Sequence, residues 1–167
     1  MDIISGSIFK CGFERSEHDS KRFLSKFGIP VSREAVACDA GTAVAEAVRI
    51  GFPVVLKASG ENLFHKTEVG GVALNLASEE EVSEASQRLL KIQGCEALLV
   101  EKMVKGDREL VCGLTRDVQF GPCVMFGIGG VLTEVFQDVV FRVAPLTPRD
   151  AQEMVKEIQN RRIIESF

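Results

Sequence analysis

The sequence predicts an α/β (α+β) protein with room for one domain or two small lobes. Of its 167 residues, 46% are hydrophobic and 26% are charged, which is the profile of a soluble globular protein. Segments with helix-capping residues and a helical apolar period alternate with short runs of β-branched residues, and no internal repeat is present. The order strand, helix, strand, turn, strand favours parallel strands.

Each predicted helix begins at a residue whose side chain can cap it. Ser16 precedes a segment with two acids in its first turn and an apolar stripe. Asp39 precedes a segment rich in alanine and valine, and Ser78 can form a capping box with Glu81. Thr147 opens the last helix, which has a proline at its first turn. The predicted helices are 16–27, 39–51, 78–93 and 149–161.

Strands are expected where β-branched and other apolar residues form short runs. The run PVVLKA, which begins at Pro53, is one of them. Two further runs flank Lys105-Gly106-Asp107, a sequence typical of a turn. Residues 1–15 show no clear period and form an unassigned tail. The predicted strands in the first two thirds of the chain are 31–38, 53–58, 72–76, 97–103 and 109–114.

Charge and cysteine content exclude several classes of protein. A net charge of -4 and a pI of about 5.3 give no basic field for nucleic acid or an anionic membrane, so a bound anion must be held locally. The five cysteines are widely spaced and form no CxxC pair, which disfavours disulfide frameworks and zinc sites and indicates the reducing cytoplasm. The sequence shows no signal peptide and no apolar run long enough for a membrane helix.

The most informative segment is 120–145, which places few charges among apolar residues and glycines. Its only charged residues are Glu134, Asp138 and Arg142. A buried carboxylate is costly unless a cation or hydrogen-bond donors compensate it, so these residues suggest a site for metal and phosphate. Their spacing by four also fits a purely structural ion-pair ladder on a helix. The valines of the segment and its glycine pair at 129–130 favour a hairpin of strands instead.

Two further places combine charge with apolar or glycine-rich surroundings. Lys57 ends a buried strand, where a lysine either serves a site or simply extends to solvent. His65 and Lys66 precede Gly70-Gly71, and backbone amides beside glycine can approach phosphate oxygens closely. An ordinary surface histidine is the alternative for His65.

The segment 101–110 is a strand that leaves the core, and it exposes backbone groups suited to the edge of an adenine ring. Glu101 can accept from amino or ribose hydroxyl groups, and Glu109 is the next acid on a strand. An ordinary charged hairpin is the alternative. Neither GxxxxGK[ST] nor GxGxxG followed by a helix occurs, so a phosphate site in this chain needs another architecture.

Four ordered blocks of sequence carry a family resemblance. With SEHDSKRFLSKFGIPV at 16–31, they resemble the ATP-grasp domain of NDP-forming acyl-CoA synthetases, in particular the β subunit of ADP-forming acetate–CoA ligase. Any one block is a weak signal, whereas the four in order are specific. The blocks are VVLK at 54–57, HKTEVGGVALNL at 65–76, LLVEKMVKGDRELVCGLTRDVQFGP at 98–122 and MFGIGGVLTEVFQDVVFRVAPL at 125–146.

The resemblance implies an ATP-grasp fold, in which two lobes, here 16–100 and 101–167, hold ATP or ADP between them. It also implies a role for each candidate residue. Lys57 would contact the α- and β-phosphates, and Gly70 and Gly71 would cover the phosphates. Glu101 and the backbone of Lys102 and Met103 would hold adenine, and Glu109 would lie near the ribose or phosphate side. Glu134 and Asp138 would bind Mg²⁺, and Arg142 would neutralise phosphate charge.

In this family, acyl-CoA, ADP and phosphate are converted into acid, CoA and ATP through an acyl phosphate and a phosphohistidine. The resemblance implies a partner, a CoA-binding α subunit or domain that carries the principal phosphohistidine, and hence a hetero-oligomer in which this chain is inactive alone. His65 matches a second histidine that relays the phosphoryl group. The family's ATP-grasp part usually extends past the position of Phe167, so a truncated C-terminal lobe is expected. A non-catalytic nucleotide-binding or regulatory module and the ATP-grasp part of a fused protein acyltransferase are the alternatives.

Overall fold

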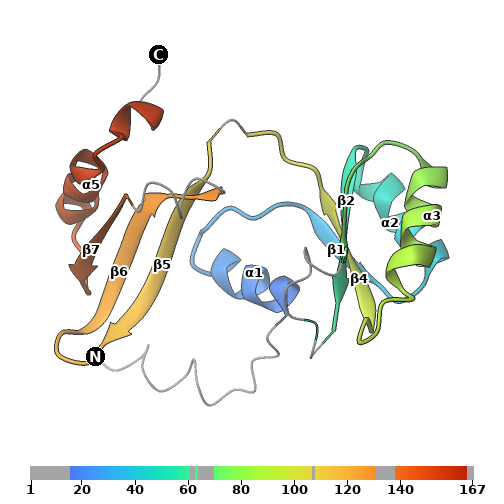
Figure 1. Cartoon of the computed structure of the whole chain (residues 1–167), viewed down its shortest axis with the longest axis horizontal. Coiled ribbons are helices and arrows are strands. Elements are labelled where there is room, and N and C mark those ends of the chain that lie inside the picture. Colours follow the sequence, from blue (N-terminus) through green and yellow to red (C-terminus); the bar gives the residue numbers. More distant parts are fainter. Residues whose placement is uncertain (1–15, 61–62, 64–69, 107, 131–137, 165–167) are drawn as a thin grey trace. The chain divides into compact units, whose positions relative to one another are not determined.

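The computed structural model of the chain describes residues 16–60, 63, 70–106, 108–130 and 138–164. The chain divides into two compact units, which we call unit 1, up to Val104, and unit 2, from Lys105 (Figure 1). The lobe boundary expected between residues 100 and 101 therefore falls inside the last strand of unit 1. Among the described residues, no helix has the length and apolar character needed to cross a membrane.

Unit 1 contains a four-stranded sheet with the strand order β1-β4-β2-β3. All hydrogen-bonded neighbours in this sheet are antiparallel, so the expectation of parallel neighbours is wrong. The reason lies in the topology. β1 and β2, which precede and follow α2 in the sequence, run in the same direction, but β4 lies between them in the sheet. In the same way, β2 lies between β3 and β4. The strands are β1 Glu34–Ala37, β2 Val54–Ser59, β3 Val72–Leu76 and β4 Ala97–Lys102.

The two faces of this sheet differ in what covers them. The helices α2 (Ala40–Ile50) and α3 (Glu79–Leu89) lie on one face, and α1 (Glu17–Ser25) lies on the other (Figure 1). The face towards α2 and α3 carries the core of unit 1, which includes the fully buried Leu56 and Val100. Because side chains alternate along a strand, the neighbouring positions on β2 and β4 point to the face of α1.

The helix starts agree with the capping residues predicted from the sequence. Ser16, Asp39, Ser78 and Thr147 each accept a hydrogen bond from the backbone amide three residues on. At Ser78 the predicted box takes a different form, because the Glu81 carboxylate accepts from the Ala77 amide at 2.7 Å. The predicted ends of three helices lie two or more residues too far along the chain. α1 ends at Ser25, α3 ends at Leu89, and α5 (Pro148–Glu157) is followed by a separate 3-10 turn, Arg161–Ile163.

Unit 2 is built on a three-stranded antiparallel sheet in the order β5-β6-β7, with α5 packed beside β7 (Figure 1). The strands are β5 Leu110–Asp117, β6 Gly121–Ile128 and β7 Val139–Val143. The strand interpretation of 120–145 is confirmed for the described residues, while 131–137 lie outside them. The hairpin alternative for 101–110 is wrong, because β4 and β5 belong to different sheets.

Gly127 in β6 provides a test of the packing around β7. A Cβ atom at this position would lie 2.4 Å from the Asp138 carbonyl oxygen and 2.6 Å from Val139 Cγ1, which no real Cβ atom tolerates. Gly127→Ala is expected to lower the free energy of unfolding by about 1–3 kcal/mol, as measured by urea denaturation. Gly113→Ala on β5 is the matched control, because its Cβ would meet only Met125 Cε at 3.6 Å. Equal effects of the two changes would contradict this account.

Candidate functional site

The face of the unit 1 sheet towards α1 brings two of the predicted site residues together. In the β2–β4 register, Val55 is paired with Glu101, and Lys57 follows two residues later on the same face. In the β1–β4 register, Glu34 lies directly opposite Glu101. Two carboxylates in such a cross-strand pair repel each other, so this face requires cations.

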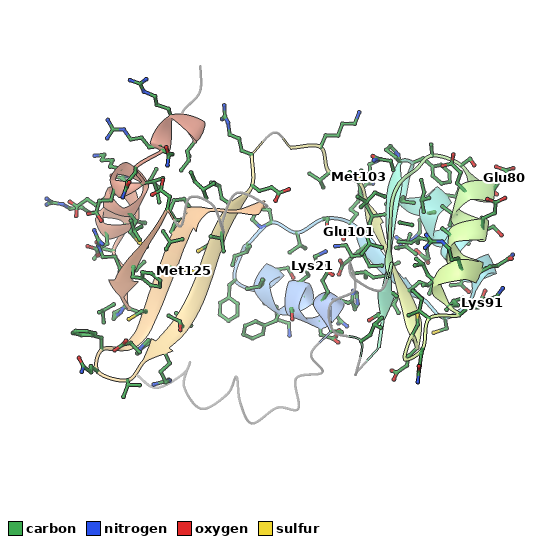
Figure 2. The ribbon with its side chains drawn as sticks, in the orientation of Figure 1. Lys21, Glu80, Lys91, Glu101, Met103 and Met125 are labelled. Carbon is green, nitrogen blue, oxygen red and sulfur yellow. The ribbon has the colours of Figure 1, made fainter. Side chains whose placement is uncertain are left out.

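Lys21 of α1 supplies one of these cations. Its ammonium nitrogen lies 2.7 Å from Glu101 Oε1, 2.9 Å from Glu34 Oε2 and 2.9 Å from Glu17 Oε1. Figure 2 shows Lys21 on α1 next to Glu101 on the sheet. One side chain therefore bridges a helix and two strands.

Lys57 supplies the second cation and closes the arrangement. Its Nζ lies 2.6 Å from Glu17 Oε1 and 2.7 Å from Glu101 Oε2. The ion pairs Lys21–Glu101, Glu101–Lys57, Lys57–Glu17 and Glu17–Lys21 form a closed circuit of alternating charge, which we call the ion-pair ring. Glu34 is attached to the ring through Lys21.

The ring shifts the ionisation of its members. Burial by itself raises the pKa of Glu101, but hydrogen bonds from Lys21, Lys57 and Ser32 outweigh burial and lower this pKa to about 2. Burial likewise opposes the charge on Lys21, whose pKa is nevertheless raised above its ordinary value by hydrogen bonds to Glu101, Glu17 and Glu34. The pKa of Lys57 is raised and that of Glu17 is lowered for the same reason, since their ion pairs outweigh desolvation.

The backbone amides of Lys102 and Met103, which we predicted to lie near adenine, are used inside unit 1. The Lys102 amide donates to the Arg33 carbonyl oxygen at 2.8 Å, and the Met103 amide donates to the Pro53 carbonyl oxygen at 3.1 Å. The Lys102 ammonium donates to the carbonyl oxygens of Gly51 and Phe52, both at 2.8 Å, at the C-terminus of α2. The side chain of Lys102 therefore points away from the ion-pair ring.

The carbonyl groups of the glycine pair that precedes β3 accept hydrogen bonds from β2 and from α3. The Gly71 carbonyl oxygen accepts from the Ala58 amide at 2.8 Å, and the Gly70 carbonyl oxygen accepts from the Arg88 guanidinium at 3.2 Å. Gly70 has a φ of 66°, a conformation that favours glycine. His65 lies outside the described residues.

In unit 2, donors compensate the buried carboxylate of Asp138. Its Oδ1 accepts from the Gln159 amide at 3.0 Å, and its Oδ2 accepts from the Asn160 amide at 2.7 Å and the Asn160 side-chain amide at 3.1 Å. Burial raises the pKa of Asp138, but these hydrogen bonds prevail and lower it. Asp138 thus fixes the chain just after α5, a role that the sequence pattern did not reveal.

The other predicted site residues of unit 2 are not gathered around Asp138. Arg142 pairs with Glu157 of α5, and this hydrogen bond raises the pKa of Arg142. Glu109 lies against the glycine pair, since its carbonyl oxygen accepts from the Gly129 amide at 2.8 Å. Glu134 lies outside the described residues. Within the described ranges, no group of three His, Cys, Asp or Glu side chains is placed to hold a metal ion.

The sequence reasoning did not identify Lys21, Glu34 and Ser32 as part of a site, and it read Glu17 only as a first-turn acid. The spacing of Glu17 and Lys21 by four on a predicted helix was the available signal. It could not reveal that both side chains meet strands β1, β2 and β4.

The low pKa of Glu101 predicts a specific loss of stability in acid. Because the folded-state pKa of about 2 lies below the ordinary value of 4.5, the stabilisation is complete above pH 4.5 and is lost as pH falls towards 2. Urea denaturation between pH 2.5 and 7 is expected to give a shallower pH dependence for Glu101→Gln than for the parent. The exposed Glu84→Gln on α3 is the control. Parallel pH profiles of parent and Glu101→Gln would show that Glu101 is not held ionised by the ring.

Comparisons with known proteins agree with this architecture. A family model described as an ATP-grasp domain matches residues 13–167. Acetate–CoA ligase [ADP-forming] II from Archaeoglobus fulgidus is 43% identical over 90% of this chain, and the matched part is 22% of the relative's length. The β subunit of acetate–CoA ligase [ADP-forming] I from Pyrococcus furiosus is 39% identical over 86% of this chain and 65% of the subunit.

A solved structure provides the same assignment in three dimensions. Acetyl-coenzyme A synthetase 1 from Ca. Korarchaeum cryptofilum, in complex with coenzyme A, Ca-AMPCP and HgCl+, has a TM-score of 0.85 and 44% sequence identity. The match covers 90% of this chain and 69% of that chain. Since the family model covers nearly all of the sequence and these relatives are 39–44% identical to it over the matched parts, this chain belongs to the ATP-grasp domain family of ADP-forming acyl-CoA synthetases.

Proposed function

We propose that this chain supplies the nucleotide-binding part of an ADP-forming acid–CoA ligase. The whole enzyme would convert acyl-CoA, ADP and phosphate into acid, CoA and ATP. The observation that carries the proposal is the fold and sequence shared with an enzyme whose structure holds coenzyme A and the nucleotide analogue AMPCP. Phosphoryl transfer depends chiefly on positioning and charge neutralisation, which an assembly of lysine, carboxylates and backbone groups can provide.

In unit 1, we assign phosphate contact to Lys57 and adenine or ribose contact to Glu101. Lys57 is half-buried at the ion-pair ring, so an incoming phosphate competes with Glu17 and Glu101 for its ammonium group. An ammonium group has three donors, which permits it to keep one carboxylate while it binds an anion. Because the Lys102 and Met103 amides donate inside unit 1, the adenine contact of this segment falls to its carbonyl oxygens, which can accept from the adenine amino group.

In unit 2, we assign Mg²⁺ binding to Glu134 and Asp138. Carboxylate oxygens suit this hard cation, which keeps waters and phosphate as its other ligands. Asp138 fits such a role through one atom only. Its Oδ2 already accepts two hydrogen bonds, whereas Oδ1 accepts one and retains a lone pair for a cation. We assign phosphate neutralisation to Arg142, which must leave Glu157 to bind the phosphate. We also propose nucleotide contacts for Glu109 and, in unit 1, for Gly70 and Gly71.

The remaining parts of the proposal concern group transfer and assembly. We assign the relay of the phosphoryl group to His65, whose neutral imidazole is a competent nucleophile near pH 7. The principal phosphohistidine and the CoA site belong to an α subunit or domain, so the active form is a hetero-oligomer or a longer polypeptide. The name of the Pyrococcus furiosus relative, a β subunit, supports a division of the enzyme into parts.

The nucleotide proposal predicts binding that depends on Mg²⁺. Calorimetric titration with ADP and ATP is expected to give a measurable affinity with Mg²⁺ and an affinity lower by about 10- to 100-fold in EDTA, the range typical of disturbed metal sites. Glu134→Gln and Asp138→Asn are expected to reproduce the effect of EDTA, with the exposed Glu84→Gln on α3 of unit 1 as the neutral control. Equal affinity with and without Mg²⁺ would remove the metal role. Unfolding of Asp138→Asn with normal binding by its folded fraction would make Asp138 purely structural.

The relay proposal predicts a selective defect in His65→Ala. Because the imidazole is not needed to hold the nucleotide, ADP affinity is expected to remain near that of the parent. With an α partner and acyl-CoA supplied, ATP formation is expected to be lost, together with acid-labile label transferred to this chain from radiolabelled ATP. ATP formation at the parental rate would mean that transfer occurs directly from the partner's histidine.

A further inference from the structure

The attachment of α1 to unit 1 rests on charge rather than on apolar burial. None of the residues of α1 is fully buried; of its two apolar side chains, Phe23 is half-buried and Leu24 is 40% exposed. Glu17 and Lys21 instead place their charged groups among those of β1, β2 and β4. The helix is therefore coupled to the residues that we assign to the nucleotide.

Carboxylates outnumber ammonium groups around the ion-pair ring in the described part of unit 1. Two ammonium groups, Lys21 and Lys57, face the three carboxylates of Glu17, Glu34 and Glu101 there. Ser32 adds a hydroxyl donor to Glu101, and His18 Nδ1 lies 2.8 Å from Glu34 Oε1. If Lys57 turns towards a phosphate, Lys21 is the ammonium group that still contacts all three carboxylates.

We propose that Lys21 is a positioning residue for nucleotide binding, which keeps Glu17 and Glu101 compensated and thereby allows Lys57 to turn from them to a phosphate. This inference rests on the proposed function, because it gives Lys57 and Glu101 their nucleotide. Lys21 itself contacts carboxylates and needs no contact with the nucleotide. Without it, Lys57 is shared among the carboxylates and is held back from the anion.

The pKa values around the ring agree with this division of roles. Lys21 contacts one more carboxylate than Lys57, and the pKa of Glu101 is lowered to about 2 by Lys21 first and then by Lys57 and Ser32, against the opposing effect of burial. Removal of Lys21 leaves a buried carboxylate with one shared cation, so the pKa of Glu101 must rise. Glu101 would then be partly protonated in mild acid and less able to accept from the nucleotide.

Two measurements on Lys21→Met test the inference. The first is a ¹³C NMR titration of the Glu101 carboxyl group without nucleotide, in which the midpoint is expected to rise by about three pKa units. The second is the Mg-ADP affinity, expected to fall about threefold at pH 7.5 and about sixfold at pH 5, where about half of Glu101 is then protonated. Lys21→Arg keeps the charge and is expected to restore both values towards those of the parent.

Lys26→Met is the matched control, because it removes the same charge from an exposed position at the end of the same helix. A general effect of lost positive charge would weaken binding equally in Lys26→Met and Lys21→Met, with no dependence on pH. That outcome, or an unchanged titration of Glu101 in Lys21→Met, overturns the inference.

Glu34→Gln extends the test to a protein that keeps Lys21. It removes the carboxylate that competes with Glu17 and Glu101 for Lys21, so Mg-ADP affinity is expected to stay equal or become tighter. A loss of Mg-ADP affinity of about threefold or more relative to the parent overturns the inference, and this criterion holds even if Lys21→Met does not fold. Absence of nucleotide binding by the parent would refute the proposed function and with it the positioning role, whereas the titration of Glu101 would still decide whether Lys21 keeps Glu101 ionised.

Discussion

The cross-strand pair of Glu34 and Glu101 is the constraint on which the side of the unit 1 sheet towards α1 depends. Two carboxylates directly opposite on adjacent strands are unfavourable unless a cation lies between them, and Lys21 provides it at 2.9 Å and 2.7 Å. Because Lys21 belongs to α1, the same interaction also decides where this helix lies. Fold and site are thus linked through charges that apolar packing alone would not specify.

In unit 2, a buried carboxylate is compensated by neutral N–H donors and not by a cation. The buried carboxylate of Asp138 is compensated by three N–H donors of Gln159 and Asn160, which lie after α5. The residues that end the helix are thereby tied to the start of β7. This arrangement places three hydrogen bonds on two oxygens and leaves a lone pair on Oδ1 for a further ligand. The local fold and a cation at this position would therefore share the same oxygen atom.

Sequence reasoning succeeded where the deciding interactions are local. The helix starts at Ser16, Asp39, Ser78 and Thr147 depend on a side chain three residues from its amide, and the strands depend on runs of apolar residues. It failed where partners are distant in sequence. Nothing near β4 and β5 reveals that they join different sheets, and nothing near Lys21 reveals Glu101. The family can be recognised from ordered blocks of sequence, whereas the ion-pair ring joins residues, such as Lys21 and Glu101, that lie far apart in the sequence.

The strand order of unit 1 has a consequence for the way the chain acquires its structure. β4 comes last of the four strands in the chain, yet it lies between β1 and β2 and is the neighbour to which β1 is hydrogen-bonded. A polypeptide growing on the ribosome can form α2 and the β2–β3 pair early, but β1 must wait for residues 98–101. Until then the apolar positions of β2 that later contact β4 remain open to other chains. The sheet of unit 1 is therefore completed only when β4 has been synthesised, so the rate of synthesis affects how long its apolar positions stay exposed.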